Sequence, residues 1–247
     1  MGIVALTWPI FIEVLLRTAL NTSDVFMLSG YSDKAVSAVG VISQISFFLI
    51  IVSTMVSSGT GILIAQYNGA SRTQDSAHVG VASIILAIIT GVLLSIIAVL
   101  GAEYFIPLYQ LEAQVEQYAQ EYLFISGALT FNVTIGVVLT TILRSHGYSK
   151  SPMVINLIAG IINVFGNYCA LYQPFGLPVY GVQGVATATV ISQLIGMFIL
   201  IGVVRSKGID LPMKQFKSVP KAIYQKIIKI GSVSYTHLTL PTTRYVE

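Results

Sequence analysis

Charged residues are scarce in this chain, and their scarcity excludes an ordinary soluble domain. Asp, Glu, Lys and Arg make up 9% of the 247 residues, and hydrophobic residues make up 55%. A soluble domain is about 25% charged. The composition therefore predicts a protein that lies in lipid. The net charge of +3 reflects basic residues in connections and near the C-terminus, so we expect no nucleic-acid partner.

Cysteine and recognisable catalytic motifs are equally scarce. Cys169 is the only cysteine, so one chain can form neither a disulfide nor a thiolate metal site. The sequence has no P-loop, HExxH motif, nucleophile elbow or clustered His/Cys site. We therefore expect no cofactor, and an intramembrane enzyme is disfavoured because it would need such a constellation.

Long uncharged runs dominate what is present. A helix needs roughly 20 apolar residues to cross the hydrocarbon core, and the runs are continuous instead of alternating as in barrel strands. The first run is too long, carries acidic residues and lacks a basic start, so we expect it to remain as a span. The prediction is an all-α integral membrane protein with six spans, at residues 3–29, 37–66, 77–101, 119–144, 152–172 and 180–204.

The distribution of lysine and arginine predicts the orientation. Basic residues follow the second, fourth and sixth spans, whereas the connection after the third span is acidic. The positive-inside rule then places both ends in the cytoplasm of a multi-pass protein of the cell (inner or plasma) membrane.

Two further segments follow the sixth span. Residues 207–231 are basic and amphipathic, which predicts a cytoplasmic linker helix along the membrane surface. Residues 232–247 are polar and rich in threonine, and they closely resemble the translation of a sequencing-library adapter. We therefore expect this tail to be non-native and the gene product to be longer.

The first span carries three charged residues on one face. Glu13, Arg17 and Asp24 fall within an arc of about 40° at 100° per residue, and a charge near the bilayer centre costs at least ~2.5–3.5 kcal/mol. Glu13 and Arg17 are spaced i, i+4, which predicts a structural ion pair. Asp24 has no such partner in its helix. A carboxylate in this setting can exchange a proton or bind a cation, although near a helix end it could also simply be solvated.

The fifth span carries a stripe of amides, Asn156, Asn163 and Asn167, again within about 40°. Their carbonyl oxygens could coordinate a small cation or their amides could bind a substrate, and asparagine also joins helices in membranes. Further polar candidates for a substrate cleft, each also explicable as a packing residue, are Gln44, Thr187 and Thr189.

Three motifs together resemble the multidrug and toxic compound extrusion (MATE) transporters. They are NTSDVFMLSG at residues 21–30, IAQYNGAS at 64–71 and GVQGVATATVISQ at 181–193. The resemblance implies two six-helix lobes across a central cleft, an internal repeat of the kind common in transporters. The chain then looks like the first lobe of a twelve-helix protein, with the linker, and a second, C-terminal lobe is its missing partner.

The resemblance also implies a function. Such proteins export small organic, often cationic compounds in exchange for Na⁺ or H⁺. Asp24 matches the acidic residue of the first helix, which is implicated in cation coupling. Asn163 and Asn167 look like the fifth-helix pair of the NorM branch, and a possible Na⁺ site would use all three residues. Rival functions are a lipid-linked oligosaccharide or polysaccharide flippase, which usually has several basic residues in its cleft, and a structural membrane subunit without transport.

Overall fold

The computed structural model describes residues 3–172, 174–176, 178–212, 216 and 219–239. This part of the chain consists of α-helices, the connections between them and two short 3-10 helices, η1 (Ile106–Tyr109) and η2 (Pro174–Gly176). The α-helices are α1 (Ile3–Ser29), α2 (Asp33–Gly69), α3 (Thr73–Tyr104), α4 (Ala113–Ala128), α5 (Thr130–Ser145), α6 (Lys150–Tyr172), α7 (Gly181–Ser206) and α8 (Lys221–Thr239).

The all-helical membrane fold is confirmed, and helices coincide with most of the predicted spans. Four helices, α2, α3, α6 and α7, are long and apolar enough to cross a membrane, and α4 with α5 forms a fifth candidate. Helices suit this environment because each satisfies its own backbone hydrogen bonds in lipid. The first predicted span corresponds to α1 (Ile3–Ser29), and its crossing of the membrane stays a prediction. Exposed Phe47, Phe48 and Phe198 are the surface expected toward lipid.

The sequence predicts one continuous helix at residues 119–144, but in the structure two helices, α4 and α5, cover this segment. α4 and α5 meet at Leu129 with a bend of 49°. A bend of this kind frees backbone N–H groups, and the N–H of Phe131 finds a partner in the Ser95 hydroxyl of α3 at 3.0 Å. Gly91 of α3 allows the approach, since a Cβ there would lie 2.6 Å from the Phe131 Cα.

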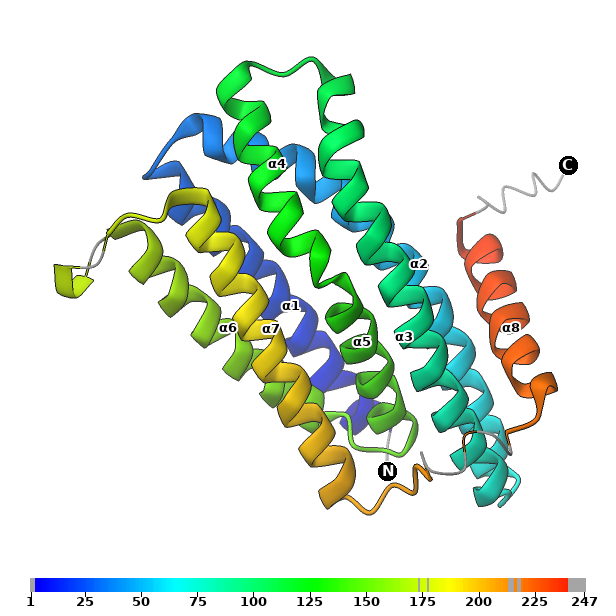
Figure 1. The fold of residues 1–247 in the computed structure, drawn as a ribbon. Helices are drawn as coiled ribbons and strands as arrows, with labels where there is room; N and C mark the ends of the chain where they lie inside the picture. Colours follow the sequence, from blue (N-terminus) through cyan, green and yellow to red (C-terminus); the bar gives the residue numbers. More distant parts are fainter. Residues whose placement is uncertain (1–2, 173, 177, 213–215, 217–218, 240–247) are drawn as a thin grey trace, which may run out of the picture.

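The spanning helices form one bundle in which α5 is central (Figure 1). α5 packs against α2 and α3 on one side and against α7 on the other, while α1 packs mainly on α6. Four apolar clusters join these helices, and the largest includes Ile64, Val79, Val138 and Ile142. The bundle thereby holds α1, α6 and α7 side by side, which brings the polar stripes of α1 and α6 together.

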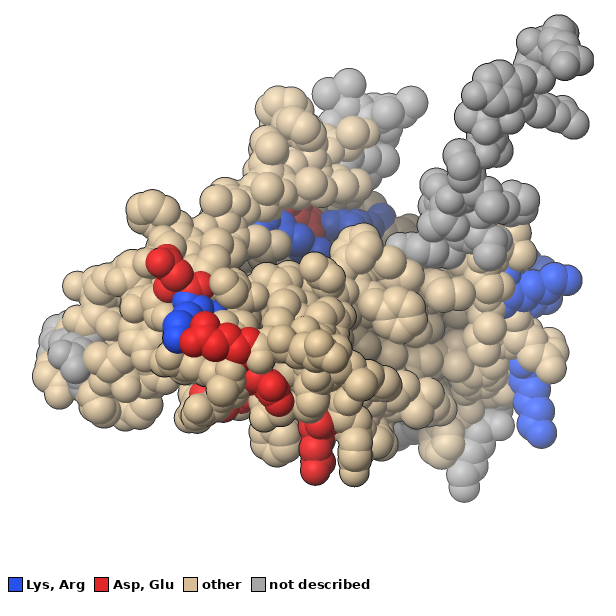
Figure 2. All heavy atoms as spheres, turned by 90° about the horizontal axis from the view of Figure 1, so that it is seen from above, with Lys and Arg blue, Asp and Glu red and all other residues tan. Residues whose placement is uncertain are grey.

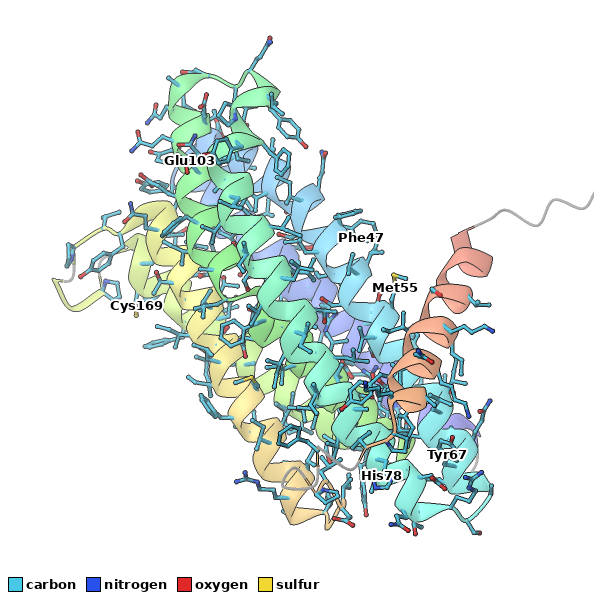
Figure 3. All side chains as sticks on the ribbon, turned by 45° about the vertical axis from the view of Figure 1, so that its right-hand side comes forward. Phe47, Met55, Tyr67, His78, Glu103 and Cys169 are labelled. Atoms are coloured by element: carbon cyan, nitrogen blue, oxygen red, sulfur yellow. The ribbon has the colours of Figure 1, made fainter. Side chains whose placement is uncertain are left out.

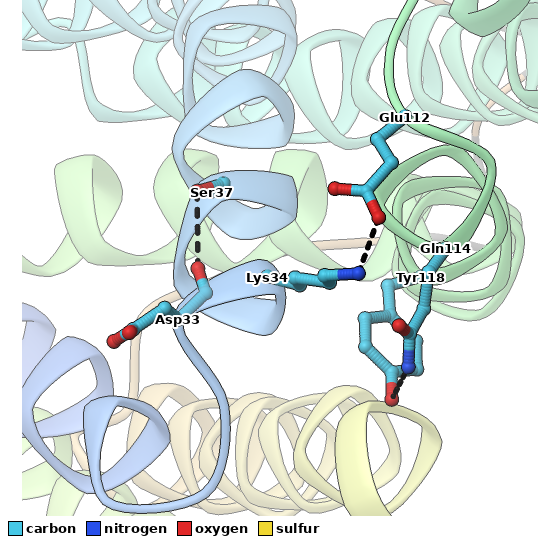
Figure 4. A network of polar contacts seen from close by, with 6 residues as sticks. All are labelled: Asp33, Lys34, Ser37, Glu112, Gln114 and Tyr118. Atoms are coloured by element: carbon cyan, nitrogen blue, oxygen red, sulfur yellow. Dashed lines mark hydrogen bonds and ion pairs between the residues drawn. The ribbon is translucent and has the colours of Figure 1, made fainter.

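The two ends of the bundle differ in charge. Glu103 lies at the end opposite Tyr67 and His78 (Figure 3), and acidic side chains gather over that end (Figure 2). There Lys34 of α2 forms an ion pair with Glu112 before α4 (Figure 4). The pair is exposed and so contributes little stability. The acidic end agrees with the predicted outer side, although which end faces the cytoplasm stays a prediction.

The predicted linker at residues 207–231 overlaps one described helix. Within the described residues, α7 ends at Ser206 and the next α-helix, α8, spans Lys221–Thr239, while residues 213–215 and 217–218 lie outside the described part. The apolar face of α8 does not face lipid: Ile223 and Ile227 are buried in the cluster with α2 and α3. α8 reaches Thr239, within the predicted tail, and residues 240–247 lie outside the described part.

α8 crosses α2 at very short range through two glycines. A Cβ built on Gly59 of α2 would overlap the backbone carbonyl of Ile227, and one built on Gly231 of α8 would overlap that of Met55. Met55 lies on the side of α2 toward α8 (Figure 3). Small residues at such a crossing let two backbones approach closely.

Candidate functional site

The first polar cluster joins α1 to α6 through Asp24 and Asn167. The Asn167 side-chain amide donates a hydrogen bond to Oδ1 of Asp24 at 2.7 Å, and Asn167 is fully buried. Its other side-chain atom, the carbonyl oxygen Oδ1, is buried without a hydrogen-bond partner among the described residues. Leaving a buried oxygen unpaired costs about 1–3 kcal/mol of folding free energy. The site therefore favours a ligand that this oxygen can bind through its lone pairs.

The cluster continues from α6 to α7. One helical turn before Asn167, the Asn163 amide donates to the Thr189 hydroxyl at 3.0 Å. The Thr189 hydroxyl in turn donates to the carbonyl of Val185 at 2.9 Å. Tyr122 of α4 lies beside this cluster, with its hydroxyl within electrostatic range of Thr189 and Asp24.

This geometry groups the predicted cation-coupling residues Asp24, Asn163 and Asn167 in one place. It adds Thr189, which the sequence suggested for a substrate cleft, and Tyr122, which the sequence did not suggest. Carboxylate, amide and hydroxyl oxygens are the hard ligands that small hard cations prefer. The arrangement can therefore accommodate a proton on the carboxylate or a sodium ion among the oxygens.

A second cluster corrects the predicted Glu13–Arg17 ion pair. Glu13 is buried, and its carboxylate pairs instead with Arg144 of α5. Its Oε1 also accepts a hydrogen bond from the Asn156 amide of α6 at 2.7 Å. Arg17 is exposed and forms no ion pair within the described part of the chain. The pair failed because tertiary packing offers Glu13 a partner from another helix.

The four predicted cleft residues do not converge. Asn156 is bound to Glu13 and Thr189 to Asn163, while the exposed Thr187 hydroxyl donates to the Gln183 carbonyl of its own helix. Gln44 lies elsewhere, in an apolar cavity of about 540 Å³ between α2, α3, η1 and α4.

Sequence reasoning also missed a series of hydroxyl contacts from α2. Ser53 meets Thr134 of α5 at 2.9 Å, and Thr60 donates to Ser83 of α3 at 2.7 Å. The sequence held a partial indication of these contacts, because Ser53 and Thr60 are seven residues apart and so lie on one face of α2. The two hydrogen bonds join α2 to its neighbouring helices.

An all-helical membrane bundle with a buried carboxylate and amides on neighbouring helices is typical of multi-pass transporters. The family follows from a direct match: a family model described as MatE covers residues 9–169. The chain belongs to the MATE family.

Relatives agree with this assignment. The chain is 32% identical over 228 residues to the "Uncharacterized transporter YisQ" of Bacillus subtilis, covering 92% of this chain and 50% of that protein. It is 30% identical over 232 residues to the "Probable multidrug resistance protein NorM" of Thermotoga maritima, covering 93% and 49%. Both relatives are named as transport or resistance proteins, not as enzymes.

Solved structures support the fold. An outward-facing multidrug resistance MATE family transporter matches with a TM-score of 0.85 and 24% identity, over 94% of this chain and 51% of that one. A MATE in complex with MaL6 matches with a TM-score of 0.86 and 24% identity. The chain thus spans about half the length of the relatives it matches.

Proposed function

We propose that this chain forms the first lobe of a secondary antiporter that exports small organic compounds in exchange for Na⁺ or H⁺. The observation that carries the proposal is the unpaired, fully buried carbonyl oxygen of Asn167 beside the Asp24 carboxylate. The relatives named as multidrug resistance proteins supply the transport class.

The coupling ion would bind at the cluster formed by Asp24, Asn163, Asn167 and Thr189. A sodium ion would use the Asp24 carboxylate together with the Asn167 carbonyl. The Asn163 carbonyl lies one helical turn before Asn167 on α6, and the Thr189 hydroxyl is hydrogen-bonded to Asn163. A proton would neutralise the carboxylate while Asn167 keeps its hydrogen bond. Either ion removes the cost of an ionised carboxylate inside the bundle.

The ion can drive export only if it binds one transporter state more tightly than the other. Its ligands come from α1, α6 and α7, so a change in how α1 packs on the other two would alter its affinity. Ion binding would favour the outward state that releases the organic compound into the medium. The second lobe would supply the other wall of the cleft, and both chain ends of this lobe would lie in the cytoplasm.

The test is Asp24→Asn in the complete protein, with efflux measured in membrane vesicles under imposed Na⁺ and H⁺ gradients. We expect gradient-driven efflux to fall roughly tenfold or more, in line with typical coupling free energies. Asp33→Asn, at the exposed start of α2, is the matched control and should leave efflux unchanged. If the Asp24 variant kept both its efflux and its ion dependence, the proposal would be wrong.

A further inference from the structure

The apolar cavity between α2, α3, η1 and α4 is separate from the polar cluster, whose residues lie mainly on α1, α6 and α7. Its volume of about 540 Å³ is in the range of small-molecule sites. Among the described residues that line it, Gln44 and Tyr109 have polar side chains and the others, such as Leu49 and Leu123, are apolar. Because cavities of this kind stay dry, a hydrocarbon fits this one better than water does.

The cavity borders the face of α3 that is expected to contact lipid. Between Ile88 and Leu100, every exposed residue of α3 is aliphatic, and these residues come in pairs that recur every four positions along one side of the helix. Ile97 belongs to this stripe and also lines the cavity. Phe48 of α2 is likewise exposed and lines it. The cavity is therefore accessible from the surrounding hydrocarbon.

The cavity lies toward the acidic end of the bundle, at the depth of one leaflet. Gln44 is about 16 Å along α2 from Asp33, where the helix begins, and Ile97 is about 10 Å along α3 from Tyr104, where it ends. The hydrocarbon core is about 30 Å thick, so both residues lie beside acyl chains. Tyr109 of η1 also lines the cavity, and tyrosine is favoured at the membrane interface.

We propose that this cavity binds one acyl chain of a phospholipid from the leaflet at the acidic end. The chain would enter from the exposed stripe of α3 and fill the space with van der Waals contacts. Lipid tails are as apolar as leucine, so these contacts with a fixed wall favour the cavity over bulk lipid. The bound chain would join α2, α3 and α4. The inference goes beyond the export function and does not depend on it.

The test uses the complete protein in phosphatidylcholine vesicles that contain a small fraction of a phosphatidylcholine with a diazirine near the end of one acyl chain. After illumination, mass spectrometry measures the labelling of individual residues. Ile89 is the matched reference for Ile97: it lies on the same stripe, is 59% exposed against 43%, and does not line the cavity. We expect Ile97 to be labelled roughly tenfold more than Ile89, because many weak contacts add up in the cavity. Equal labelling would overturn the inference, and this comparison needs no variant to fold.

Gly101→Leu fills the cavity. A Cβ at Gly101 would lie 3.0 Å from the Phe105 ring, which is itself exposed and lines the cavity. The variant should bring the labelling of Ile97 down to that of Ile89. Gly202→Leu is the matched control, since a Cβ there meets nothing within 4 Å, and it should leave the labelling unchanged.

Two further outcomes would contradict the proposal. Labelling of Ile97 that persists in a folded Gly101→Leu variant would place the lipid outside the cavity. Loss of the labelling of Ile97 on adding tetraphenylphosphonium, an apolar cation, would assign the cavity to an organic compound instead of a lipid. Export is measured separately, in vesicles under ion gradients, so its failure leaves this result unaffected.

Discussion

Replacing Arg144 tests the buried network that the structure puts in place of the predicted Glu13–Arg17 pair. Arg144→Gln leaves the Glu13 carboxylate, whose side chain is 5% exposed, with Asn156 as its remaining partner. Breaking a buried ion pair on one side costs about 3–5 kcal/mol. The Arg144 side chain is 30% exposed and Asn156 still donates, so we expect the lower end, about 3 kcal/mol. That lowers the folding equilibrium constant roughly a hundredfold.

The assay is unfolding of the purified chain in mixed micelles by increasing SDS, followed by the helical circular dichroism signal. Arg17→Gln is the control, and as an exposed substitution it should change the unfolding free energy by less than about 0.5 kcal/mol. The double variant Glu13→Gln/Arg144→Gln should recover part of the loss, because no charge is then left unpaired. Equal losses in the Arg17 and Arg144 variants would refute the network.

Two other predictions follow from the same structure. Gly59→Ala should loosen α8, because the new methyl group would meet the Ile227 backbone, whereas Gly40→Ala, which meets nothing within 4 Å, should not. Amide hydrogen exchange across α8 would report the difference, and equal exchange in both variants would contradict the glycine crossing. Asn163→Leu should weaken the stabilisation of the complete protein by Na⁺ relative to choline by roughly tenfold in apparent affinity. Thermal unfolding in the two salts measures it, and unchanged stabilisation by Na⁺ would remove Asn163 from the site.

Helix positions followed closely from the sequence, because hydrophobic length is set by the bilayer. The predicted span at 152–172 corresponds to α6 (Lys150–Tyr172), and that at 180–204 to α7 (Gly181–Ser206). The break at Leu129 could not be foreseen, since neither proline nor a polar run marks it. It depends on Gly91 and Ser95 of α3, which are distant in sequence.

The candidate site was predicted in its residues and only partly in its contacts. The periodicity of α6 placed Asn156, Asn163 and Asn167 on one face, and that of α1 placed Asp24 near its end. Periodicity fixes the face of a helix but not the neighbour that it meets. For that reason the sequence could place Asn156 on the polar face of α6 but could not indicate its hydrogen bond to Glu13.

The sequence by itself determined that this is an all-helical membrane chain of the MATE type, since apolar length and local motifs are properties of contiguous residues. Only the tertiary structure decided which polar groups are satisfied. In the structure Glu13 pairs with Arg144, Asn167 hydrogen-bonds Asp24, and α8 packs against α2. Arg17 has no ion-pair partner among the described residues. Those outcomes depend on the packing of helices far apart in sequence, where the cost of an unpaired buried charge selects the partner.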